Sequence, residues 1–83
     1  MVNYIVTLQC VDVPGIVRAA SAAIVAIDGN ILENDQFTDP VTGQFCMRTR
    51  FETRTADIER VRTQLNGDLA SFSPKLGIRL EDA

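Results

Sequence analysis

The sequence predicts an α+β sandwich, a four-stranded antiparallel sheet with two helices on one face. The apolar residues follow strand and helix periods in the order strand, helix, strand, strand, helix, strand. Gly and Pro residues separate these segments, and 83 residues suffice for one small domain. Two right-handed split β-α-β units of this kind place the strands in the spatial order fourth, first, third, second.

The first half of the chain predicts a strand, a tight turn and an amphipathic helix. Apolar and polar residues alternate over Asn3–Cys10, which is the period of a strand with one drier face. Pro14 and Gly15 then break the strand. A helical stripe of Ile and Ala residues covers Ile16–Ile27, and Gly29 suits the left-handed position that ends such a helix.

A polar strand and a hairpin are predicted next. Ile31–Thr38 contains four consecutive amide and carboxylate residues, which a central strand could not bury, so we expect it at the sheet edge. Asp39–Gly43 has the Pro and Gly of a hairpin turn. Gln44–Thr53 alternates cleanly, with Phe45 and Met47 facing the core.

The last segments predict a second helix and a final strand. Thr53 or Thr55 can cap the helix, with Asp57 in its first turn. Its apolar stripe runs through Ile58, Val61 and Leu65, and it ends at Asn66–Gly67 or one turn later, after Leu69. A loop precedes a final strand over Lys75–Glu81.

Charge argues against several partners. The net charge is −3, and the eight basic residues, seven of them Arg, are scattered along the chain. Nucleic acids and anionic membranes both require a concentrated basic surface, so we expect neither as a partner. The longest apolar run, Ala22–Ile27, is too short to span a bilayer, and no secretory signal follows Met1. The sequence therefore predicts a cytoplasmic location.

Catalytic and metal-binding chemistry are poorly represented. The chain has no His, and its two cysteines, Cys10 and Cys46, form no C-x-x-C pair, so we expect reduced thiols and no metal site. No glycine-rich phosphate loop, cofactor motif or nucleophile–base pair is visible. We therefore expect no cofactor, and a sensing or regulatory module rather than a self-sufficient enzyme.

The turn after the first strand is the main candidate binding site. A helix that begins near Gly15 leaves backbone N–H groups without partners, and these groups with the helix dipole can hold a ligand carboxylate. Asp12 can cap the helix or pair with a ligand ammonium group. The alternative is an ordinary strand-to-helix turn in which Asp12 caps and Pro14-Gly15 sets the geometry.

The polar second strand is the other candidate. Asn30, Glu33, Asn34, Asp35 and Gln36 fall on alternate faces of an edge strand, whose unpaired backbone groups a second copy of the chain can extend into a continuous sheet. Their side chains can then contact a ligand beside the partner's turn. The alternative is a solvated edge. Arg48 and Arg50 lie opposite the core and can pair with Glu33 or Glu52.

The six-element order, the turn Asp12-Val13-Pro14-Gly15-Ile16-Val17 and Gly29-Asn30-Ile31 together resemble an ACT domain over Asn3–Leu80. The resemblance implies the ferredoxin-like βαββαβ sandwich and a regulatory role, commonly exercised by binding amino acids and pairing with another ACT domain. The ligand-binding residues that it implies are Asp12, Val13, Pro14, Gly15, Ile16, Val17, Asn30, Ile31 and Leu32.

A narrower resemblance lies in the hairpin. Asp39-Pro40-x-Thr42-Gly43-x-Phe45-x-Met47-Arg48, after Asp35-Gln36, is similar to the N-terminal region of formyltetrahydrofolate deformylases, although Cys46 stands where that family often has Phe. It implies that residues 1–83 are one ACT domain and that a catalytic hydrolase domain follows Ala83. It also implies a parent enzyme that hydrolyses formyltetrahydrofolate to formate and tetrahydrofolate, with glycine or methionine as effector by pathway reasoning. The alternatives are a stand-alone ACT-type regulator and a purely structural dimerisation module.

Overall fold

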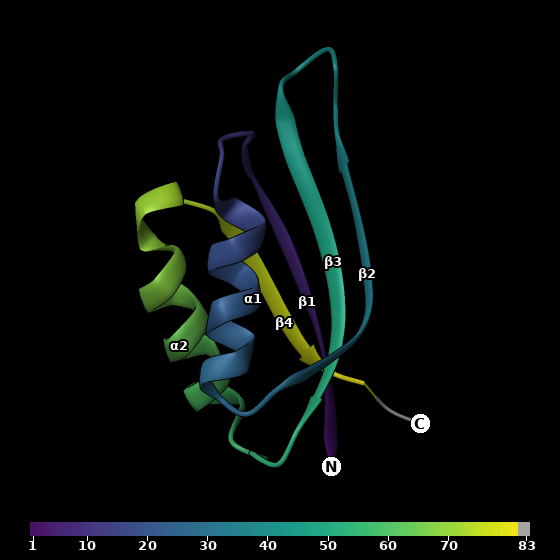
Figure 1. The fold of residues 1–83 in the computed structure, drawn as a ribbon, viewed down its shortest axis with the longest axis vertical. Coiled ribbons are helices and arrows are strands. Elements are labelled where there is room, and N and C mark those ends of the chain that lie inside the picture. Colours follow the sequence, from purple (N-terminus) through teal and green to yellow (C-terminus); the bar gives the residue numbers. More distant parts are fainter. Residues whose placement is uncertain (82–83) are drawn as a thin grey trace.

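Four strands form one antiparallel sheet, and both helices pack on the same face of it, as Figure 1 shows. The computed structural model describes residues 1–81. Its sheet has the order β2-β3-β1-β4, which confirms the predicted strand order and the ferredoxin-like βαββαβ architecture. The bounds are β1 (Val2–Val11), α1 (Ile16–Ala26), β2 (Asn30–Thr38), β3 (Gln44–Thr53), α2 (Ile58–Leu69) and β4 (Lys75–Leu80), with a short 3-10 turn over Ala70–Phe72.

The core lies between the sheet and the helices. The inward-facing residues of β1 and β3 are buried, as their alternation predicted, and Tyr4 stacks on Phe51 with ring centroids 5.6 Å apart. Ala20 and Ala23 of α1 are also buried, and their small side chains let the helix approach the sheet closely. The remaining large core residues are Val6, Leu8, Ile16, Ile24, Ile27, Phe45, Met47, Val61, Leu65 and Leu69.

The end of α1 differs from the prediction. Asp28, not Gly29, takes the left-handed conformation, with φ 57°. Gly29 is required for a different reason, since a Cβ there would lie 2.7 Å from the carbonyl oxygen of Ile24 and 2.5 Å from its Cγ2. The Gly29 N–H also donates to that carbonyl at 2.8 Å. This close packing of Gly29 against Ile24 lets the chain pass directly from α1 into β2.

The start of α2 also differs from the prediction. Asp57 is the N-cap residue itself, and its carboxylate accepts hydrogen bonds from the N–H groups of Glu59 (3.0 Å) and Arg60 (3.4 Å). Thr55 and Thr53 do not cap the helix. Thr53 instead donates to the Ile27 carbonyl at 2.6 Å, joining β3 to the end of α1. At its other end α2 continues past Gly67 to Leu69, because Leu69 is fully buried.

Substitution of Asp57 by Ala should lower the free energy of unfolding by about 1 kcal/mol, since two N–H groups of α2 then lose their acceptor. Asp68→Ala is the matched control, because Asp68 carries the same charge in the same helix but caps nothing; its effect should stay within about 0.5 kcal/mol. Urea unfolding followed by circular dichroism measures both. Equal midpoints for the two variants would contradict the capping role.

None of the helices in residues 1–81 is long and apolar enough to cross a membrane.

Candidate functional site

The turn between β1 and α1 leaves the start of the helix open. Gly15 is the N-cap residue, with φ 91°, a left-handed conformation that favours glycine. No side chain caps α1, and its first turn contains no acidic residue. Within residues 1–81, no side chain accepts a hydrogen bond from the N–H groups of Ile16, Val17 and Arg18. A Cβ added at Gly15 would meet nothing within 4 Å, so a ligand can approach the backbone closely.

Asp12 has a different role from the cap that the sequence suggested as one possibility. Its carboxylate accepts a hydrogen bond from the Thr38 hydroxyl at 3.1 Å, and its N–H donates to the Gly43 carbonyl at 3.1 Å. Asp12 therefore ties the turn to the end of β2 and the hairpin tip. Asp12 is exposed, and its carboxylate accepts no hydrogen bond from the helix start, which follows three residues further along the chain.

The other predicted residues, Asn30, Ile31 and Leu32, form the first part of β2. Asn30 pairs with Glu52 and Ile31 with Phe51, but Glu33 pairs with Arg50, so Leu32 is an extra residue in a β-bulge. The bulge places Asn30 on the same face as Glu33, which strict alternation would not do. The Asn30 amide donates to Glu52 at 3.4 Å, and Ile31 and Leu32 are exposed apolar side chains.

A single chain does not bring the two groups of predicted residues together. Asp12 lies beside Thr38, at the end of β2, whereas Asn30 begins the same strand. Eight residue steps of an extended strand span about 26 Å. Figure 1 shows the β1–α1 turn and the α1–β2 connection at opposite ends of the helix.

Strand β2 is confirmed as a polar edge strand. Within residues 1–81 it pairs only with β3, and all nine of its residues are exposed. The Asn34 side-chain oxygen accepts from Thr49 at 2.7 Å on the helix side. The outer edge of β2 leaves backbone groups available to another strand.

The helix-free face of the sheet carries an ion-pair network that the sequence partly predicted. Arg50 binds Glu33 at 2.9 Å and Glu81 at 3.3 Å, and Asn3 donates to the same Glu81 oxygen at 3.4 Å. The hydrogen bond to Glu33 raises the pKa of the Arg50 guanidinium above its ordinary value. This network holds the end of β4 against β1 and β3.

Two surface hollows of the described chain contain none of the nine predicted residues. The larger, of about 580 Å³, lies over all four strands, and the smaller, of about 340 Å³, lies between the end of β1 and Phe72. Sequence reasoning did not identify either one. The available signal was Phe37, an aromatic residue at an outward position, which follows four consecutive polar residues of β2.

Comparison with known proteins identifies the class of domain to which this fold belongs. No family model matches the chain. A formyltetrahydrofolate deformylase of Bacillus subtilis is 38% identical over 69 residues, which are 82% of this chain but 22% of that protein. The chain thus spans about a fifth of the length of this curated relative.

Solved structures agree on the fold. A formyltetrahydrofolate deformylase from Pseudomonas syringae superposes with a TM-score of 0.86 and 26% identity, over 96% of this chain and 28% of that one. An ACT domain protein from Streptococcus pneumoniae gives 0.82 and 21%, over 95% and 89%. The regulatory subunit of aspartate kinase from Thermus thermophilus gives 0.73 and 18%, over 94% and 51%.

The chain thus has the fold of an ACT domain. Within that class the chain is a homologue of formyltetrahydrofolate deformylase, matching a part of that hydrolase.

Proposed function

We propose that this domain is the regulatory module of a formyltetrahydrofolate deformylase, and that it binds a small amino acid at a site shared between two copies. The proposed parent enzyme carries a catalytic hydrolase domain after residue 83 and releases formate and tetrahydrofolate. The sequence relative supports the parent enzyme, since it is about five times longer than the matched segment. The observation that carries amino-acid binding is the open start of α1 beside the Asp12 carboxylate.

The turn offers complementary groups for a zwitterion. The N–H groups of Ile16, Val17 and Arg18 and the positive end of the α1 dipole suit a carboxylate. Asp12 supplies a negative charge at the neighbouring position, where a ligand ammonium group would compete with the Thr38 hydroxyl. Val13 and Pro14 complete the turn between these two groups. A ligand with adjacent positive and negative charges satisfies both.

A second copy completes the site. In an antiparallel pairing of β2 with β2 of another copy, the start of one strand faces the end of the other. Asn30, Ile31 and the bulged Leu32 of one copy then lie near the turn of its partner, although about 26 Å separates these residues from the turn within one chain. The pairing would also cover the exposed apolar side chains of Ile31 and Leu32. Binding at such an interface favours one subunit arrangement over another, which is the basis of regulation.

Titration calorimetry with glycine and with methionine tests the sensing function. We expect saturable heat with one of them, weakening of about tenfold or more in Asp12→Ala, and loss of the heat in Gly15→Leu. Gly67→Leu is the matched control, because a Cβ at Gly67 also meets nothing within 4 Å, and Gly67 lies in α2, outside the turn and its hydrogen-bond partners. That variant should keep binding.

Sedimentation velocity on the same samples separates sensing from assembly. We expect a dimer in which amino-acid binding and association strengthen each other. A dimer that gives no heat with any amino acid would refute the sensing function and leave a structural dimerisation module. A monomer that binds its ligand fully would refute the shared site.

A further inference from the structure

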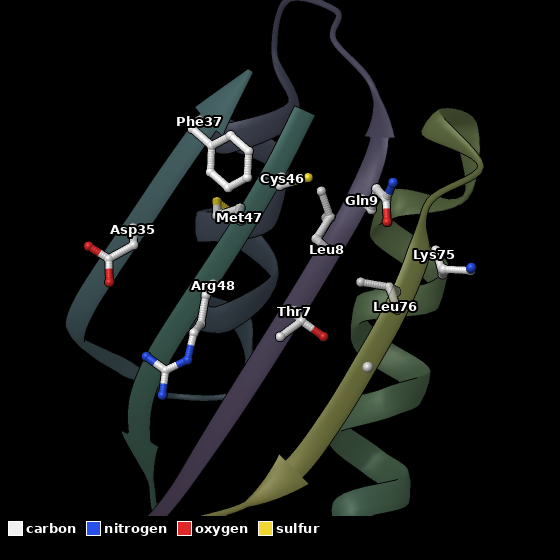
Figure 2. Close-up of a pocket in the computed structure, with 11 residues that line it drawn as sticks. Thr7, Leu8, Gln9, Asp35, Phe37, Cys46, Met47, Arg48, Lys75 and Leu76 are labelled. Carbon is white, nitrogen blue, oxygen red and sulfur yellow. The ribbon is translucent and has the colours of Figure 1, made fainter. Parts of the chain in front are cut away.

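The helix-free face of the sheet contains a hollow of about 580 Å³ whose shape follows from the strand register. Two rungs of outward side chains cross all four strands. One rung is Phe37, Cys46, Gln9 and Lys75, and the next is Asp35, Arg48, Thr7 and Gly77. The β1–β4 half of the second rung is low, because Thr7 is small and Gly77 has no side chain. Figure 2 shows these residues around the hollow, which we call the sheet groove.

The walls of the sheet groove are apolar on one side. Phe37 is 66% exposed on β2, and its neighbour across the strands is the thiol-bearing Cys46. Most of the surface that lines the groove is apolar. Phe37 and Lys75 lie on strands three spacings apart, about 14 Å, which is wide enough for a flat ring system lying on the sheet. A volume of this size is typical of small-molecule sites.

The charged groups around the sheet groove are two cations, Arg48 and Lys75, and one carboxylate, Asp35. Arg48 and Lys75 form no ion pair within residues 1–81, whereas Arg50, one rung further on the same face, is held by Glu33 and Glu81. The two rungs differ in the length and in the direction of the carboxylate side chain. Glu33 reaches Arg50 across the strands, but Asp35, one methylene shorter, makes no ion pair with its cross-strand neighbour Arg48. Figure 2 shows the Asp35 carboxylate pointing away from β3.

From this arrangement we infer that the sheet groove binds an organic anion with a flat apolar body. The ring system lies between Phe37, Cys46 and Thr7, and its anionic group binds Arg48 or Lys75. Two exposed cations in a protein of net charge −3 favour such a ligand over a cation. The site is separate from the β1–α1 turn, and it does not depend on the proposed regulatory function.

Binding of 8-anilinonaphthalene-1-sulfonate (ANS) to the folded 83-residue chain tests the inference. We expect a saturable fluorescence rise at one probe per chain. The native cysteines supply a second readout. Iodoacetamide should modify Cys46 about fivefold or more slowly when the probe is bound, because the thiol lines the groove. Cys10 is the internal control, since it faces the core, and burial raises the pKa of its thiol.

Two variants of the Asp35–Arg48 rung distinguish binding in the sheet groove from nonspecific binding of the probe. Arg48→Gln should weaken probe binding about three- to tenfold. Asp35→Glu should weaken it to a similar extent with no change in net charge, because the longer carboxylate reaches Arg48 and occupies it, as Glu33 occupies Arg50. Arg60→Gln, on the exposed surface of α2, should bind the probe as the native chain does. Thermal unfolding establishes that each variant is folded.

Wild-type affinity in both Arg48→Gln and Asp35→Glu would overturn the inference, as would failure of the bound probe to slow alkylation of Cys46. Cys46 that is unreactive until the protein is diluted would show that the groove is a protein interface, which also overturns it. Gly15→Leu separates the two proposals: it should abolish amino-acid binding and leave probe binding unchanged.

Discussion

Substitution of Gly29 by Ala should lower the free energy of unfolding by about 3 kcal/mol. The new Cβ would lie 2.7 Å from the Ile24 carbonyl oxygen and 2.5 Å from Ile24 Cγ2. A side chain can rotate away, but the carbonyl belongs to the last turn of α1, so the helix end and the start of β2 must separate. Differential scanning calorimetry should show a melting temperature lower by about 10 °C or more.

Gly67 provides the matched control for this substitution. It lies inside α2, and a Cβ there would meet nothing within 4 Å. Gly67→Ala should raise the free energy of unfolding by about 0.5–1 kcal/mol, since alanine favours the helix more than glycine does. The two Gly→Ala changes should therefore shift the melting temperature in opposite directions. A Gly29→Ala protein that melts with the native chain would show that the α1–β2 connection is pliable.

Truncation of Phe51 to Ala should have the largest effect of any single core change, about 3–5 kcal/mol. Phe51 is fully buried, stacks on Tyr4, and lies beside Gly29 at the base of the sheet. A domain of this size has little stability to lose, so we expect a largely unfolded chain at room temperature. Circular dichroism and urea unfolding measure the loss.

Phe37→Ala is the control for Phe51→Ala. Phe37 is the same residue type on the neighbouring strand, but it is 66% exposed on the helix-free face. Its truncation should change the free energy of unfolding by about 0.5 kcal/mol or less. The same variant should weaken ANS binding, because it removes one wall of the sheet groove. A comparable loss of stability in the two variants would show that the helix-free face is part of the core.

Several features of the fold were predictable because each depends on residues close together in the chain. The alternation over Gln44–Thr53 predicted β3 with its observed bounds, and the polar residues of β2 placed that strand at the edge. The open helix start was also predictable, because Pro14 and Gly15 set the local backbone conformation. The role of Gly29 was not predictable from the sequence. A glycine after a helix suggests a left-handed cap, and only the packing of Ile24 shows that close approach is the reason.

The capping residues illustrate the same limit. Thr53, Thr55 and Asp57 can all cap a helix, and the sequence offers no means of choosing among them. In the folded chain Thr53 is occupied by the Ile27 carbonyl, and Asp57 lies at the helix start. The candidate site shows the same limit of sequence-based prediction, since Asp12 contacts Thr38, a partner 26 residues away.

The sequence alone determined the order of the elements, the polar edge strand and the open turn at Gly15, because side-chain period and backbone preference are local properties. Only the tertiary structure decided which side chains meet. The cross-strand register formed the rung that leaves Arg48 without the carboxylate that Arg50 has, and it separated Asn30 from the turn by the length of β2. Register depends on packing between segments far apart in the chain, so no local pattern reveals which residues face each other. It places Asp35, whose side chain is one methylene shorter than that of Glu33, opposite Arg48.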